Sequence, residues 1–117
     1  MTIETIASIC HAANRQYCES LGDSSQNDWK LSPPWQIEAS IAGVKFRLKN
    51  IHGTPEEQHN AWLKDKREAG WKYGLVKDIE KKEHPCFLPY SQLPELQKVK
   101  DVIFISIVDG LKEFLTE

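Results

Sequence analysis

The chain lacks the features that mark membrane, secreted and disulfide-bonded proteins. It contains no run of 18 apolar residues, so no segment is predicted to span a membrane. Its N-terminal residues lack the basic stretch of a secretory signal. The three cysteines, Cys10, Cys18 and Cys86, are odd in number and irregularly spaced. That argues against a disulfide framework and for a reducing compartment, so we expect a cytoplasmic protein.

Motifs that usually mark catalysis are also missing. There is no nucleophile elbow, no glycine-rich phosphate loop and no visible acid–base pair. A metal site needs three or four ligands, and neither His84 with Cys86 nor His11 with Cys10 has a suitable spacing. Cys86 with His84 or His59 is the one nucleophile–base pair left open. We therefore expect no catalysis, no metal and no cofactor, and an enzyme using Cys86 is the alternative.

Length and composition predict one ordinary globular domain spanning residues 1–117. The 117 residues are 40% hydrophobic and 27% charged, with a formal net charge of −2. A chain of this length buries enough surface to fold without disulfides or metals. A near-neutral balance gives no bias toward nucleic-acid polymers or membranes.

The first half of the chain predicts two helices. Apolar residues spaced three and four apart run from Ile3 to Tyr17, and Gly22 is placed to end that helix. A polar loop follows up to Asp28. Ser32 can then cap a second helix with Pro33 in its first turn. Two apolar stripes predict that this helix is central and buried on much of its circumference; they are Trp35, Ala39, Ala42 and Phe46, and Ile37, Ile41, Val44 and Leu48.

A capping box predicts the third helix. Thr54 and Glu57 can satisfy each other's amides around Pro55, and Gly70 is suited to end the helix in a left-handed conformation. Residues 71–90 form a long connector, in which Tyr73-Gly74-Leu75-Val76 can pair briefly as an extended segment.

The last segment, from Leu93 to Phe114, has two possible structures. Residues 102–108 are β-branched enough for a buried strand. Helical spacing over a longer stretch and charged flanks favour a helix, although Gly110 weakens that prediction. The fold class we expect is a mainly α domain of about four helices, with a long ordered connector that contains a short extended or hairpin segment.

The second half of the chain is rich in glycine, proline and aromatic residues at specific positions. Gly70 and Gly74 bracket Trp71-Lys72-Tyr73, and prolines then fix the path of the chain. Together with residues before and after, this order resembles the RyR domain, the repeat of ryanodine receptors that also occurs as single copies in bacterial and phage proteins. The residues that carry the resemblance are His59, Trp62, Gly70-Trp71, Tyr73-Gly74, Asp78, Lys82, His84-Pro85, Pro89-Tyr90, Leu93 and Pro94-Glu95.

The resemblance covers about residues 54–101, and residues 1–50 form a helical extension that is similar to the start of the prokaryotic single-domain versions. The chain departs from the family at Asn60, where a glutamate is usual, so the resemblance implies no role that needs a carboxylate there. The resemblance implies a small helical, non-catalytic module that contacts neighbouring domains and is associated with nucleotide-type ligands. A stand-alone copy has no channel to gate, so calcium release is not implied.

An aromatic and basic cluster is the candidate binding site. Residues 64–82 hold seven basic and four acidic side chains in a chain that is net negative. Flat rings can stack on a base and cations can pair with phosphate, which suits a nucleotide-like anion. The expected ligand-binding residues are His59, Trp62, Arg67, Trp71, Lys72, Tyr73, His84 and Tyr90.

The aromatic residues have a second interpretation. They can form core while the lysines form a solvated surface, in which case Trp71 would be buried. Four tryptophans in a small domain also fit a protein-interaction or oligomerisation module, because tryptophan is enriched at interface hot spots. His59 and His84 can be structural, with the His84 ring docked on the third helix.

Overall fold

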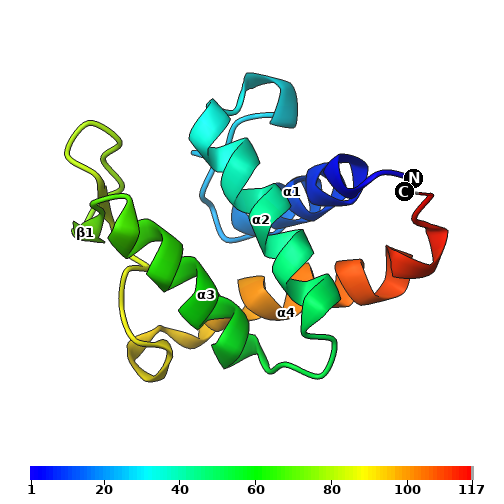
Figure 1. Cartoon of the computed structure of the whole chain (residues 1–117). Coiled ribbons are helices and arrows are strands. Elements are labelled where there is room, and N and C mark those ends of the chain that lie inside the picture. The colour runs from blue at the N-terminus through cyan, green and yellow to red at the C-terminus, as the bar shows by residue number, and fades with distance from the viewer. Residues whose placement is uncertain (117) are drawn as a thin grey trace.

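The computed structural model describes residues 1–116 and places four α-helices in them (Figure 1). These are α1 (Ile3–Ser20), α2 (Pro34–Lys49), α3 (Pro55–Glu68) and α4 (Glu95–Leu111). Three short 3-10 segments, η1 (Trp29–Leu31), η2 (Tyr90–Gln92) and η3 (Lys112–Phe114), and two short strands, β1 (Lys72–Tyr73) and β2 (Glu83–His84), complete the fold. The expectation of a mainly α domain with a short extended pair is confirmed.

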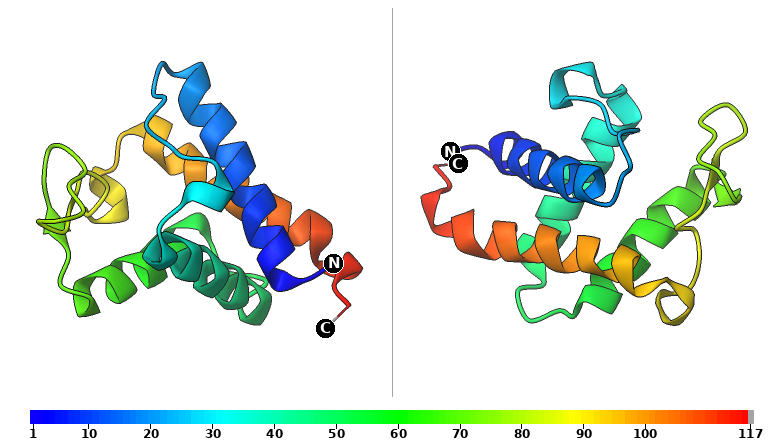
Figure 2. Two further views of the ribbon diagram at one scale, coloured as in Figure 1. Left: turned by 90° about the horizontal axis from the view of Figure 1, so that it is seen from above. Right: turned by 180° about the vertical axis from the view of Figure 1, so that it is seen from behind.

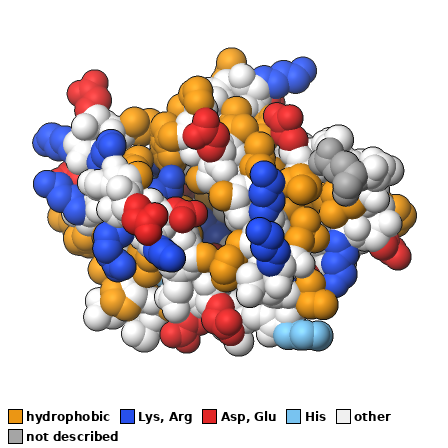
Figure 3. Space-filling view, in the orientation of Figure 1, with side chains coloured by type: hydrophobic (Ala, Val, Ile, Leu, Met, Phe, Trp, Pro, Cys, Tyr) orange, Lys and Arg blue, Asp and Glu red, His pale blue; other side chains and the backbone are white. Residues whose placement is uncertain are grey.

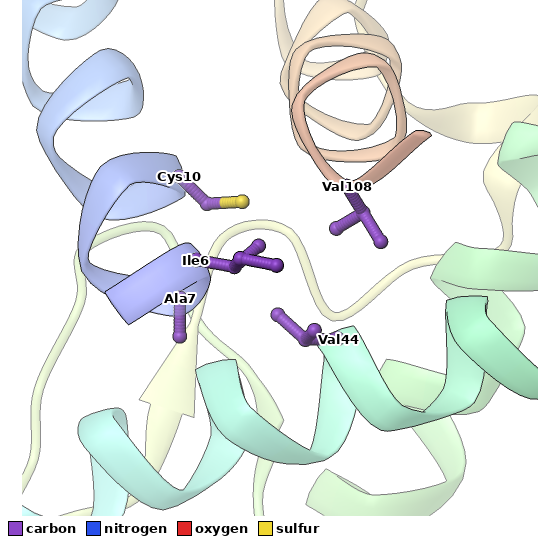
Figure 4. Packing of buried hydrophobic residues seen from close by; sticks show 5 residues of the cluster. All are labelled: Ile6, Ala7, Cys10, Val44 and Val108. Atoms are coloured by element: carbon purple, nitrogen blue, oxygen red, sulfur yellow. The ribbon is translucent and has the colours of Figure 1, made fainter. Parts of the chain in front are cut away.

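The core lies where α1, α2 and α4 meet. Helices α1 and α4 run side by side in opposite directions, and α2 crosses them (Figure 2). Figure 4 shows Ile6, Ala7, Cys10, Val44 and Val108 converging at this point, each no more than 2% exposed. Burial of one such aliphatic side chain stabilises the fold by roughly 1.5–3 kcal/mol. Helix α3 packs against α2 and α4 at the edge of this core.

Three helix ends have the capping residues that the sequence predicts. The Thr54 hydroxyl accepts from the Glu57 amide at 3.2 Å, and the Glu57 carboxylate accepts from the Thr54 amide at 3.2 Å. Gly70 follows α3 with a φ of +91°, and Gly22 follows α1 with a φ of +86°. Both glycines adopt the left-handed conformation that L side chains avoid.

The predicted cap of α2 is wrong. Ser32 ends η1, where its hydroxyl donates to the Asp28 carbonyl at 3.2 Å, and Pro33 is the N-terminal cap residue of α2. Because Pro34 follows it, Pro33 is held extended, with a ψ of 153°, and the helix begins one residue later than expected.

Helix α4 resolves the choice between helix and strand. The β-branched residues 102–108 are helical, with Ile105 and Val108 buried and Val102 48% exposed. Long-range packing on one helical face outweighs local strand propensity. The helix is shorter than predicted, because Pro94 precedes it and η3 follows it. No helix within residues 1–116 is long and apolar enough to cross a bilayer.

A buried arginine ties the second and fourth helices together. The Arg47 guanidinium donates to both carboxylate oxygens of Asp109, at 2.9 and 2.8 Å. It also donates to the carbonyls of Asn50 and Gly53, at 3.2 and 2.6 Å. Asp109 raises the pKa of Arg47, and Arg47 lowers the pKa of Asp109. Helix α2 contacts the other three helices, as expected for a central helix. The predicted burial on much of its circumference is wrong, because only Val44 and Arg47 of α2 are buried.

The connector is anchored by β1 and β2. They pair in parallel, with Lys72 opposite Glu83 and Tyr73 opposite His84. A Cβ on Gly74 would lie 2.6 Å from the Glu83 Cβ, so the close approach of the two segments depends on this glycine. Strand β1 ends at Tyr73, and the Gly74 amide still donates to the His84 carbonyl at 3.3 Å. The extended segment was predicted to continue through Leu75 and Val76, but these two side chains are exposed and unpaired with β2.

Candidate functional site

A cavity of about 870 Å³ lies between α2, α3 and α4 and reaches α1 and the connector. Figure 3 shows the face between α2 and α3 hollowed, with lysine or arginine side chains beside the hollow. The α2 stripe predicted as core, Trp35, Ala39, Ala42 and Phe46, lines this cavity. These residues were predicted to pack closely in the core, but they form one wall of a cavity large enough for a small ligand.

Trp35 is the aromatic centre of the cavity. The Lys66 ammonium lies 4.6 Å and the Lys77 ammonium 5.3 Å from its ring centroid. Trp71 packs against Trp35 from the connector, with ring centroids 5.0 Å apart. Cations at these distances from an aromatic face are attracted by its π electrons. Sequence reasoning assigned Trp35 to the core, and no local motif distinguishes it as a site residue.

Lys66 is a buried residue whose cation forms no close ion pair within residues 1–116. Its side chain points from α3 into the cavity wall, and the residue is 6% exposed. Within residues 1–116 its ammonium has neither a carboxylate within 4 Å nor a hydrogen-bond acceptor. Burial lowers its pKa, and the nearby charge of Asp65 opposes part of this shift. A buried ammonium in this state favours the arrival of an anion.

Lys77 and Lys100 add positive charge to the same wall of the cavity. Burial and the charge of Lys100 lower the pKa of Lys77, which also lines the cavity. Burial lowers the pKa of His84 to about 4, and the charges of Lys77, Lys100 and Lys66 add to this effect. Three lysines from α3, the connector and α4 thus gather around one neutral histidine. Over its whole lining the cavity has six lysines and three carboxyl groups: Lys45, Lys49, Lys64, Lys66, Lys77 and Lys100 against Glu57, Asp65 and Asp101.

Asp101 differs from the other carboxyl groups. Burial raises its pKa to about 7, although the charge of Lys100 opposes the shift. Near neutral pH this group is only partly ionised. The positive charge of the lysines is therefore less compensated than the number of carboxyl groups indicates.

Histidines and a cysteine hold the remaining wall in place. The His84 ring packs edge-on to Trp62 at 5.1 Å and accepts from the Cys86 amide at 3.0 Å. The predicted docking of His84 on the third helix is confirmed. The Cys86 thiol donates to Gln97 at 3.2 Å, and burial raises its pKa. Among residues 1–116, no three His, Cys, Asp or Glu side chains are grouped as metal ligands.

The structure separates the eight predicted binding residues. His59, Trp62 and His84 line the cavity. The Lys72 side chain is exposed on β1, and Arg67 lines a smaller recess of about 310 Å³ beside Phe87. Tyr90 lies outside the cavity, with its ring 6.0 Å from that of His59.

Trp71 and Tyr73 do not form one open surface with Trp62. Trp71 is 7% exposed, because the turn at Gly70 directs it behind Trp35, while Tyr73 is 45% exposed on β1. Burial of Trp71 counts against the predicted stacking surface. Trp35 and Lys66 instead place an aromatic ring next to a cation, on the inner side of Trp71.

Comparison with known proteins gives one family. The RyR domain matches residues 45–115, from the second half of α2 to the end of η3. This range contains Lys66, Lys77, His84 and Asp101 but not Trp35. No solved structure matches the chain. Since the match extends over more than half of the sequence, the chain belongs to the RyR domain family.

Proposed function

We propose that this RyR domain binds a small, ring-containing anion of the nucleotide type in the cavity between α2, α3 and α4, and that it catalyses no reaction. The observation that carries the proposal is Lys66, a buried residue whose ammonium lies 4.6 Å from the Trp35 ring centroid and, within residues 1–116, has no carboxylate within 4 Å. Removing a charge from water is costly, and groups whose pKa is perturbed in this way cluster at functional sites.

Size and shape of the cavity support a small-molecule ligand. About 870 Å³ is within the usual range for ligand pockets. Its walls combine apolar groups from α2 with convergent cations, which is the usual composition of a pocket that orients a charged ligand. A base or other flat ring can pack against apolar walls while phosphate oxygens accept from the lysines.

Cys86 gives little support to the alternative of an enzyme. A nucleophilic cysteine needs a lowered pKa, whereas burial raises the pKa of this thiol. The neighbouring His84 accepts from the Cys86 backbone amide instead of facing the sulfur as a base. The chain is proposed to be cytoplasmic, because its three cysteines are all free thiols.

Titration with ATP, followed by tryptophan fluorescence and calorimetry, tests the proposal. We expect Lys66→Gln to weaken ATP binding at least about tenfold, since the lost contact is a buried charge-assisted one. Lys72→Gln is the matched control, because Lys72 is exposed on β1 and lies outside the cavity. It is expected to change affinity less than about twofold.

The two variants separate the cavity from the surface first predicted. Weaker binding in Lys72→Gln with normal binding in Lys66→Gln would move the site to β1 and contradict the cavity. Absence of a response to AMP, ADP, ATP and GTP at millimolar concentration would overturn the nucleotide proposal itself.

A protein-interaction module is the second candidate. Four apolar or aromatic side chains of the connector are exposed: Tyr73, Leu75, Val76 and Ile79. Leu75 is 84% exposed, and a group of exposed apolar side chains, unlike a single one, is typical of docking surfaces. Light scattering of the wild type and Leu75→Ser tests this. A monomer at every concentration would remove self-association as the function.

A further inference from the structure

Asp101 is an acid in a wall that otherwise attracts anions. It lies on α4 and lines the cavity, and its side chain is 20% exposed. An ionised carboxylate at this place would repel the proposed ligand. Burial raises the pKa of Asp101 to about 7, so the neutral form is accessible near physiological pH.

The His59 ring faces Asp101 in a defined tautomer. Its Nε2 lies 2.8 Å from the Leu88 carbonyl oxygen, which can only accept, so Nε2 carries a proton. Nδ1 lies 3.9 Å from Oδ2 of Asp101. When the ring is neutral, Nδ1 presents a lone pair to the carboxyl group. A lone pair opposite a carboxylate is unfavourable, and one proton held by either partner removes the repulsion. The pair therefore favours retaining one proton.

Charged groups on the neighbouring elements determine how firmly that proton is held. On α4, the charge of Lys100 lowers the pKa of Asp101. From the connector, Cys86 interacts with Asp101 as a buried neutral thiol, and His84 and Lys77 lie in the same wall. From α3, burial lowers the pKa of His59. The other titratable groups of the cavity are Cys10 and His11 on α1, Lys45 and Lys49 on α2, and Glu57, Lys64, Asp65 and Lys66 on α3.

We propose that the cavity takes up its anion together with a proton held by the His59–Asp101 pair, so that affinity falls as pH rises. The inference rests on the proposed function and adds a regulatory property to the same site. A bound anion cancels the field of Lys100 and adds a negative charge near Asp101. Both effects raise the affinity of the pair for its proton, and by linkage the proton raises the affinity for the anion.

Calorimetry with ATP in two buffers of different ionisation enthalpy measures the protons taken up. The terminal phosphate of ATP also titrates in this range, so the wild type is compared with Asp101→Asn, in which only the ligand's own protonation remains. We expect extra proton uptake by the wild type near neutral pH. Its affinity should fall about tenfold more than that of the variant between about pH 6 and about pH 8.5. His52→Gln, in the exposed α2–α3 loop, is the control and should behave as the wild type.

Each outcome has a separate meaning. If ATP binds and both proteins show the same pH dependence and proton uptake, the linkage is overturned while the proposed function stands. If ATP binds neither protein at any pH, the ATP site and its linkage both fall.

A measurement on the wild type covers the case in which Asp101→Asn does not fold. The ring ¹⁵N shifts of His59 should report a proton on Nε2 in the free protein. The midpoint of the Nδ1–carboxyl titration should rise when ATP is added. A ring protonated on Nδ1 alone, or a midpoint that ATP leaves unchanged, contradicts the inference.

Discussion

At the residue scale, two buried groups in one wall respond to pH in opposite directions. Burial lowers the pKa of His84 to about 4, so His84 disfavours the fold when it must be protonated, and its contribution to stability rises from about pH 4 to 6.5. Burial raises the pKa of Asp101 from its ordinary 3.8 to about 7. Its ionisation is therefore costly in the folded state, and its contribution falls as pH rises through the same range.

Removing one group should reveal the other. We expect Asp101→Asn to be more stable than the wild type at neutral pH, and the difference should grow by about 1 kcal/mol per pH unit between about pH 4.5 and 6.5. Denaturant unfolding of both proteins across this range measures it. His84→Asn should change the slope with the opposite sign. A stability difference that is constant with pH would show that Asp101 ionises normally in the folded protein.

At the element scale, the connector depends on the close pairing of β1 with β2. This pairing holds Trp71 behind Trp35, and the same connector brings Lys77 to the cavity. A side chain on Gly74 would meet the Glu83 Cβ at 2.6 Å, whereas a Cβ on Gly110 in α4 meets nothing within 4 Å. The two glycines therefore offer a test in which the same chemical change has opposite effects.

Gly74→Ala is expected to destabilise the fold by about 1–3 kcal/mol, since the backbone segments must separate to admit the methyl group. Gly110→Ala is the matched control and should stabilise by about 0.5–1 kcal/mol, because alanine is the better helix former. Chemical denaturation of both variants measures the effects. Equal stability changes in the two proteins would mean that the β1–β2 approach is not tight.

At the scale of the whole molecule, the charge around the cavity is opposite in sign to the net charge of the chain. The chain has a net charge of −2, yet the cavity wall holds six lysines and three carboxyl groups. Environments that lower the pKa of Lys66 and Lys77 also disfavour their charged forms in the folded protein. Such a site reduces stability until a ligand compensates it.

Neutralising Lys66 should therefore stabilise the free protein and weaken its response to ligand. We expect Lys66→Met, which keeps the packing on Trp35, to raise the free energy of unfolding by about 1 kcal/mol. The increase in melting temperature on adding ATP should largely disappear. Thermal unfolding with and without ATP measures both effects, with Lys72→Gln as the control. A loss of stability in Lys66→Met would show that the cation–π contacts outweigh the cost of burial.

The sequence by itself determined the elements that depend on local chemistry. The capping box at Thr54, the left-handed Gly22 and Gly70 and the helical spacing of α4 are properties of short segments, and the structure has them as predicted. The order of residues from His59 to Glu95 likewise indicated the RyR family, because a motif set is read along the chain. The start of α2 was missed by one residue, since two consecutive prolines shift the cap.

Only the tertiary structure decided which residues share a site. Trp35 joins Lys66, Lys77 and Lys100 because α2, α3, the connector and α4 meet around one cavity, and these residues are far apart in sequence. Spacing in the sequence indicated only that Trp35 lies on an apolar helix face. Trp71 was predicted as either core or ligand surface, and its packing against Trp35 makes it core. Side-chain burial depends on contacts between distant segments, and for that reason local patterns do not predict it.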